Sequence, residues 1–276
     1  MSKMGMLYIE KDSLFHRMDG SIKFLLFITW YIAIFMFMDL RVFGALTLLG
    51  VFMLYMSKIP YKNIRPLLWV MIVFNIVNSI FILLITPTYG TKLVGSNTAV
   101  LNIGYATINL ETIMYVLTLA LKYANLLPIT LIFIFTTHPS RFASSLNKIG
   151  LPYKIAYAIN IAFRYIPDIQ EEFKTIVNAQ QARGLSFKKG EASLGQRIKN
   201  VASVGLPLVI SSLHRIEVVT NAMELRSFGK YKKRTWYSST SLKKSDYGTL
   251  VFCILFLIIC FWIKAKFFTG LWYPFR

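Results

Sequence analysis

Two arginines stand at matching places in a repeated pattern in the second half of the chain. Residues 178–183 and 221–226 both have the form N-A-x-x-x-R, and they end in Arg183 and Arg226. Each copy closes an amphipathic segment and has a glycine close behind it. A guanidinium group presents a planar fork of donors that binds a carboxylate bidentately and tolerates partial burial. The pattern therefore predicts two cationic contacts with acidic groups of a partner protein.

A purely structural role for these arginines is equally open from their spacing. A cation in the last turn of a helix is favoured by the helix dipole without any partner. Each arginine, however, continues towards the apolar side of its helix, since Arg183 lies seven residues after Ile176 and Arg226 seven after Val219. A buried charge without a partner costs several kcal/mol. Each arginine that enters a partner would therefore need its own carboxylate.

The rest of the sequence holds few groups arranged for catalysis. The segment 190–196 has the glycine spacing of a phosphate loop, but it lacks the Lys-Ser/Thr pair that reaches the terminal phosphates and Mg²⁺. The three histidines, His16, His138 and His214, have no metal-ligand spacing. We therefore expect no catalytic residue, no cofactor and no metal in this chain.

Glu111 and Lys122 are charged residues within one long apolar stretch. Charges inside membrane spans are functional candidates by default, so an intramembrane transferase is an alternative function. Eleven residues separate the two along a helix, which corresponds to about 16 Å and is too far for a direct ion pair. The sequence leaves the role of both residues open.

Composition and hydropathy place the chain in a membrane. Of its 276 residues, 55% are hydrophobic and 16% are charged, and the mean hydropathy is +0.54. Soluble domains are usually about 45–50% apolar and about 25% charged, and about 20 apolar residues suffice to span a bilayer as a helix. The sequence predicts an all-α polytopic membrane protein with about five transmembrane helices, at Ile22–Met38, Val42–Met56, Pro66–Thr86, Ile108–Phe135 and Gly248–Ile263.

Prolines and short turns predict some details of these spans. The first two spans are short and close together, so they could pair as a tight helical hairpin. Pro66 and Pro87 bound the third span, and Pro128 predicts a kink in the fourth.

The net charge of +19 is unevenly distributed along the chain. Residues 138–246 hold eighteen Lys and Arg against seven Asp and Glu. Basic residues close to the ends of spans mark the cytoplasmic side of a membrane protein. We therefore predict that the N-terminus and the 137–246 region are cytoplasmic, that the C-terminal tail is outside, and that nucleic acid is not a partner.

Residues 137–246 have the pattern of amphipathic helices rather than of a loop. Phe142, Leu146 and Ile149 are spaced for one helix, and Pro152 and Pro167 each mark the start of another, because proline is favoured in the first turn. Three regions follow from these patterns: transmembrane helices 1–4 in 1–136, a cytoplasmic region of amphipathic helices in 137–246, and the last transmembrane helix with its tail in 247–276.

The ends of the last two amphipathic helices resemble a known family. They are similar to the T component of energy-coupling factor transporters, the EcfT or CbiQ family, which carries an A-R-G motif at the end of each of two coupling helices. The first motif is intact as Ala182, Arg183 and Gly184. The second stands as Leu225, Arg226 and Ser227 and departs from the family pattern at both flanks.

The resemblance extends over most of the chain, from residue 14 to about residue 263. Residues 14–19 with Lys23 are similar to the family's N-terminal pattern L-H-x-L-D-P-R-x-K, although Gly20 and Ser21 replace Pro-Arg. Residues 136–139 and 163–167 also resemble family segments.

The resemblance implies a function in ATP-driven uptake of a vitamin or a metal ion. Two cytoplasmic ABC-type ATPase subunits, which would hold ATP and Mg²⁺, would bind the coupling helices at Arg183 and Arg226. A membrane-embedded substrate-binding S component would lie against the apolar helix faces and the lipid bilayer. The residues expected to contact it are Ile159, Phe163, Leu206, Val209, Leu213 and Ile216. The resemblance also implies the plasma membrane of a prokaryote and leaves the substrate to the S component.

Two other transport functions remain as alternatives. A stand-alone polytopic transporter would use the intramembrane polarity of Asn75, Asn78, Lys122 and Asn125, but such carriers usually show more spans and internal symmetry. An ABC permease also couples to ATPases, although normally through short loops rather than about 110 residues of helices.

Overall fold

Apolar helices form the first of the two units into which the chain divides. The computed structural model describes residues 8–9, 11–95, 98–103, 106–185, 193–231, 235–236 and 243–267. The first unit contains Leu7–His138 and Thr240–Arg276, and the second contains Pro139–Ser239. The described helices of the first unit are α1 (Leu14–Arg17), α2 (Gly20–Met36), α3 (Leu40–Ser57), α4 (Tyr61–Ile85), α5 (Tyr89–Val94), α6 (Leu110–Thr136) and α10 (Lys244–Phe267).

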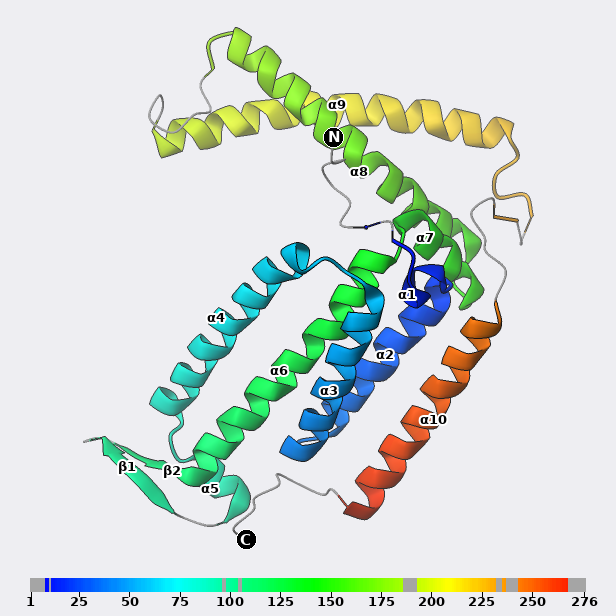
Figure 1. Ribbon diagram of the computed structural model, residues 1–276. Coiled ribbons are helices and arrows are strands. Elements are labelled where there is room, and N and C mark those ends of the chain that lie inside the picture. The colour runs from blue at the N-terminus through cyan, green and yellow to red at the C-terminus, as the bar shows by residue number, and fades with distance from the viewer. Residues whose placement is uncertain are drawn as a thin grey trace. The chain divides into compact units, whose positions relative to one another are not determined.

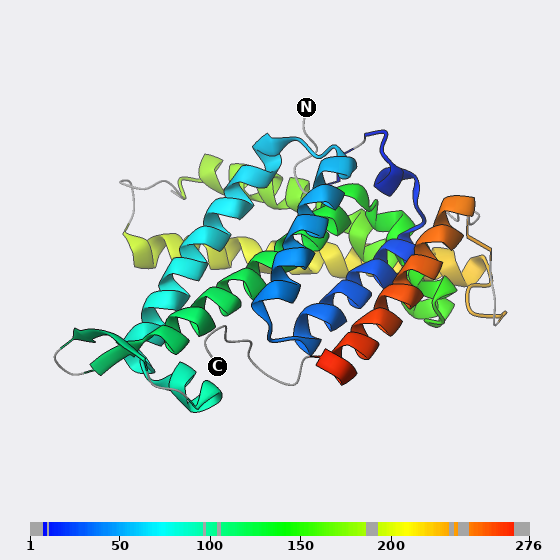
Figure 2. The same ribbon diagram turned by 60° about the horizontal axis from the view of Figure 1, so that its bottom comes forward.

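Helix α6 is the central helix of the first unit. Helices α2, α3, α4 and α5 each pack against it, and α10 packs against α2 (Figure 1). The same arrangement is visible in the view turned by 60° (Figure 2). The predicted tight hairpin of the first two spans is wrong, because α2 and α3 pack mainly on α6 rather than on each other.

Asn125 on α6 makes buried hydrogen bonds to both α2 and α3. Its backbone oxygen accepts a hydrogen bond from Trp30 Nε1 at 3.0 Å, and its Nδ2 donates to the backbone oxygen of Phe43 at 3.0 Å. Close packing of α3 on α6 depends on Gly50, since a Cβ there would lie 3.0 Å from Pro128 Cγ. Protein interiors are closely packed, so the helices would have to shift to accommodate a methyl group at Gly50.

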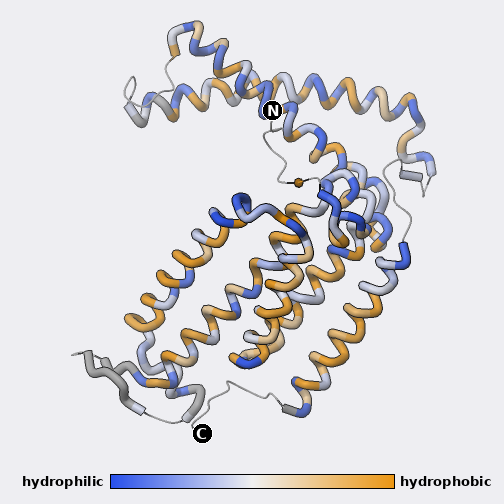
Figure 3. Tube along the Cα trace, in the orientation of Figure 1, coloured by the Kyte–Doolittle hydropathy of each residue, from blue (hydrophilic) through white to orange (hydrophobic). Residues whose placement is uncertain are grey.

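The outward surface of these helices is apolar, as lipid contact requires. Figure 3 shows hydrophobic residues along α2, α3, α4, α6 and α10. Helix α4, all of which the structure describes, has no buried residue. Only a helix satisfies all its backbone hydrogen bonds internally, so an apolar helix of this kind is stable in contact with lipid.

Among the residues that the structure describes, five helices are long and apolar enough to cross a membrane, which confirms the predicted polytopic all-α class. Four of them match predicted spans: Leu40–Ser57, Tyr61–Ile85 and Lys244–Lys266 are longer than predicted, and Leu110–Thr136 is shifted by one to two residues from the predicted 108–135. The fifth, Ile198–Leu225, belongs to a helix that was predicted to be cytoplasmic. The first predicted span is the shorter helix α2, of 17 residues.

A short β-hairpin precedes α6 and was not predicted. Strand β1 (Ala99–Ile103) pairs antiparallel with β2 (Ala106–Asn109), with Leu101 opposite Ile108. Strands of four and five residues are too short to give a clear alternation of apolar and polar positions.

The second unit consists of three helices among its described residues: α7 (Pro139–Lys148), α8 (Tyr153–Ala182) and α9 (Leu194–Leu225). The spacing of apolar residues predicted α7 correctly. The prediction that Pro167 begins a separate helix is wrong, since α8 is one helix that continues through it. Proline removes one backbone hydrogen-bond donor from a helix. The helix can continue through it, with or without a kink, when the hydrogen bonds of the turns before and after it are formed. In the same way, α4 runs through Pro66 and begins five residues before it.

Candidate functional site at the ends of two helices

Helix α8 ends in a Schellman motif built around Gly184. The backbone N–H of Gly184 donates to the oxygen of Gln181 at 2.9 Å, and that of Leu185 donates to the oxygen of Gln180 at 3.1 Å. Gly184 has a φ of 89°, which costs glycine nothing because it lacks a Cβ. Arg183 is the C-cap residue of this motif and is exposed.

Helix α9 ends in the same motif although its sequence differs. The backbone N–H of Ser227 donates to the oxygen of Glu224 at 2.8 Å, and that of Phe228 donates to the oxygen of Met223 at 3.0 Å. Ser227 takes the left-handed place with a φ of 54°. Arg226 is the C-cap residue and is exposed. The two arginines therefore occupy equivalent positions in two helix ends of the same backbone geometry.

The end of α9 is attached to the beginning of α8 through aromatic side chains. The ring of Phe228 lies 4.7 Å from that of Tyr157 and 5.6 Å from that of Tyr153, centre to centre. Trp236 lies 6.2 Å from Tyr157, and its Nε1 donates to Asn147 Oδ1 at 3.1 Å. The sequence gives no sign of this cluster, because Tyr153 and Tyr157 lie more than 70 residues before Phe228 and share no short pattern with it.

The apolar faces expected to contact a partner are largely uncovered within this chain. Leu206, Val209, Leu213 and Ile216 on α9 are exposed, with between 55% and 68% of each residue accessible. Ile159 and Phe163 on α8 are half-buried. Exposed apolar surface of this extent marks an interaction site or a lipid contact.

Residues of the N-terminal family pattern form a buried junction at one end of the first unit. Lys23 Nζ donates to the backbone oxygen of Thr136, the last residue of α6, at 2.6 Å. Asp246, near the start of α10, accepts from the backbone N–H of Asp19 at 3.1 Å and from that of Lys243 at 2.8 Å. Lys23, Asp19 and Asp246 are all buried. The start of α2 is therefore hydrogen-bonded to the end of α6 through Lys23 and to the start of α10 through Asp19.

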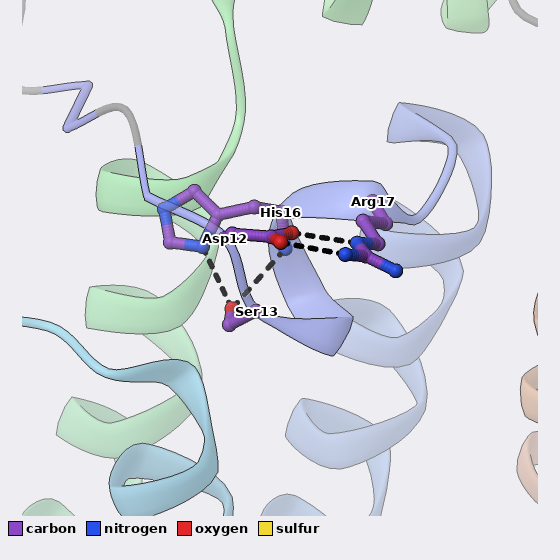
Figure 4. Close-up of polar contacts among 4 residues, drawn as sticks. All are labelled: Asp12, Ser13, His16 and Arg17. Carbon is purple, nitrogen blue, oxygen red and sulfur yellow. Dashed lines mark hydrogen bonds and ion pairs between the residues drawn. The ribbon is translucent and has the colours of Figure 1, made fainter.

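His16 and its neighbours complete this region (Figure 4). His16 Nε2 lies 2.8 Å from the backbone oxygen of Ile9, and Nδ1 lies 2.7 Å from Ser13 Oγ. A carbonyl oxygen can only accept, so Nε2 carries the proton and Nδ1 accepts from the serine. Burial lowers the pKa of His16. Outside this buried part, Arg17 holds Asp12 in an exposed bidentate pair with both distances 2.6 Å.

The two charged residues of the fourth span have separate surroundings. Glu111 is fully buried, and its Oε1 accepts from the backbone N–H of Thr98 at 3.1 Å and from Thr98 Oγ1 at 2.7 Å. Lys122 is half-buried, and its Nζ lies 5.2 Å from the centre of the Phe35 ring. Within the described part of the chain, no group of three or more His, Cys, Asp and Glu could hold a metal ion. Of the predicted linker at 190–196, residues 190–192 lie outside the described residues, while Ser193 is the N-cap and residues 194–196 are the first turn of α9.

Comparisons with known proteins agree on one family. The family model CbiQ, described as cobalt transport protein, matches residues 11–237. A relative named energy-coupling factor transporter transmembrane protein EcfT, from Brevibacillus brevis, is 28% identical over 94% of this chain and 97% of its own length. Proteins of the same name from Heliobacterium modesticaldum and Bacillus subtilis are 30% and 24% identical, each over 94% of this chain and over 96% and 97% of their own lengths.

Proposed function

Because this chain belongs to the CbiQ family and is the transmembrane component of an energy-coupling factor transporter, we propose that it transmits ATP-driven movement from two cytoplasmic ATPase subunits to a membrane-embedded substrate-binding subunit. The chain itself performs no catalysis, and its partners hold the ATP and Mg²⁺. The substrate class is vitamins or metal ions.

One observation carries the proposal: Arg183 and Arg226 cap two helices with the same backbone geometry. Two like ends suit two like partners, and a guanidinium group at each end can enter an acidic groove bidentately. Each helix end would contact one ATPase. The residues of this contact are Ala182, Arg183, Gly184, Leu225, Arg226 and Ser227.

The uncovered apolar faces of α8 and α9 support contact with the substrate-binding subunit. Burial of apolar surface is favourable and has no fixed direction, so a partner can slide across such a face without breaking specific bonds. The high apolar content of α9 fits this role, since Ile198–Leu225 is as long and apolar as a membrane span.

The orientation is also part of the proposal. The N-terminus and the 137–246 region lie on the cytoplasmic side of a prokaryotic plasma membrane, because the basic residues concentrate there. The ATPase subunits that contact Arg183 and Arg226 need ATP, which is available on the cytoplasmic side.

The test is a mild-detergent purification of the tagged chain from its own membranes, with every co-purifying chain identified. We expect two ATPase subunits and a small, very apolar protein. One small protein would identify a dedicated transporter, and several would identify a shared coupling module. An intact chain that brings no ATPase would contradict the proposal.

A further inference from the structure

Helices α8 and α9 are joined by an ion pair between two half-buried residues, Glu172 and Arg215. Glu172 on α8 accepts hydrogen bonds from Ser211 Oγ and from Arg215 Nη2 on α9, the latter at 2.5 Å. The side chains of Glu172 and Arg215 are only 19% and 29% exposed. The Arg215 guanidinium also lies 5.6 Å from the centre of the Tyr165 ring. Removal of either partner leaves the other charge half-buried and without its counter-ion.

The ion pair joins equivalent positions of the two helices. Glu172 lies eleven residues before Arg183, and Arg215 lies eleven residues before Arg226. At 1.5 Å per residue, each C-cap arginine is about 16 Å along its helix from the crossing. The C-terminal ends of α8 and α9 lie on opposite sides of this crossing (Figure 1, Figure 2). The crossing is therefore equidistant along the two helices from the two arginines.

A second attachment fixes the angle between the helices. One contact would hold α8 and α9 together but leave them free to turn about it. The packing of Phe228 on Tyr153 and Tyr157 ties the end of α9 to the beginning of α8. Tyr157 and Glu172 are fifteen residues apart on α8, or about 22 Å. Two attachments this far apart prevent rotation at either one.

We propose that Glu172 and Arg215 are positioning residues that make α8 and α9 a rigid bracket and hold Arg183 and Arg226 at one fixed separation. This inference rests on the proposed function. With a fixed separation, a movement of one ATPase at Arg183 is imposed on the other at Arg226. The two ATPases then act on the membrane helices as one body rather than independently.

The separation can be measured in the full chain with spin labels. Gln181 and Glu224 each precede a C-cap arginine by two residues and are exposed, so cysteines there report the distance between the two ends. The two native cysteines, Cys253 and Cys260, are buried and are replaced by alanine. We expect a single narrow distance distribution for the unaltered bracket.

Charge reversal tests the ion pair. We expect Glu172→Arg and Arg215→Glu each to broaden the distribution and to lower ATP hydrolysis by the co-purified complex about fivefold or more. The double swap Glu172→Arg/Arg215→Glu restores both, because it re-forms the pair with its direction reversed. Glu171→Arg is the matched control, since Glu171 is the exposed neighbour of Glu172 and carries the same charge.

The outcomes separate the inference from the proposed function. Unchanged distributions in both single variants would overturn the bracket, and so would broadened distributions with full ATP hydrolysis. A wild-type chain that brings no ATPase would instead contradict the proposed function, and the distance measurement would still test the bracket.

Discussion

Gly184 and Ser227 hold the same left-handed backbone conformation, each one residue after the C-cap arginine of its helix. The family motif has glycine at both places, and serine keeps the geometry at a steric cost of about 1–2 kcal/mol. The departure in sequence at Leu225 and Ser227 therefore leaves the backbone of the second motif unchanged.

Glycine substitutions test these caps. Gly184→Ala should destabilise the protein by about 1 kcal/mol, because a Cβ is strained at a φ of 89°. Gly205→Ala is the control, since Gly205 lies inside α9 with open space around it and alanine favours a helix. Ser227→Gly should be neutral or slightly stabilising. Glycine relieves the backbone strain at this positive φ, which stabilises the folded state, but it also raises the conformational entropy of the unfolded chain, which offsets the gain. Thermal unfolding in detergent measures all three, and equal stability of the two alanine variants would refute the expectation.

Loss of the C-cap arginines should uncouple the transporter. Arg183→Glu and Arg226→Glu should each weaken ATPase recovery more than tenfold, since loss of one partner of a buried charge pair costs about 2–5 kcal/mol. The double variant should recover no ATPase at unchanged membrane abundance. Lys199→Glu, an exposed site near the start of α9, gives the same change of charge as a control. ATPase recovery by the double variant at the wild-type level would exclude the arginines as the principal contacts.

The buried junction should contribute to the stability of the first unit. Asp246→Ala removes the acceptor of the Asp19 and Lys243 backbone N–H groups, and an unsatisfied buried donor costs about 1–3 kcal/mol. Asp12→Ala removes an exposed ion pair and should change stability little. Denaturation of the purified chain compares the two variants. A similar effect of both would show that burial of the junction contributes nothing.

His16 should make stability depend on pH. Burial lowers its pKa in the folded chain below the usual value of about 6.5, so the folded state binds fewer protons than the unfolded state. The stabilisation is complete above about pH 6.5 and is lost as the pH falls through the lowered pKa. We expect the unfolding temperature to fall between pH 7.5 and pH 5.5, and to fall less in His16→Gln. An equal decrease in both proteins would assign the effect to other groups.

The parts of the fold that the sequence predicted depend on local composition. Long apolar stretches identified the spans, and the repeated pattern ending in Arg183 and Arg226 identified both helix ends. The continuation of α8 through Pro167 was missed, because proline marks a helix start more often than a helix interior. Glu172 and Arg215 were missed because a pair 43 residues apart leaves no periodic signal. The place of Asp246 opposite Asp19 likewise depends on tertiary packing.

The hydrogen bond between Asp19 and Asp246 also sets an order of assembly. It joins residues 227 positions apart, at the first turn of α2 and the start of α10. A ribosome adds residues at about 5–20 per second, so α2 waits at least about ten seconds for α10 to be synthesised. During that interval the backbone N–H of Asp19 lacks its native acceptor. Completion of this bundle is therefore a late event of biogenesis, governed by the synthesis of the last helix rather than by the insertion of the first.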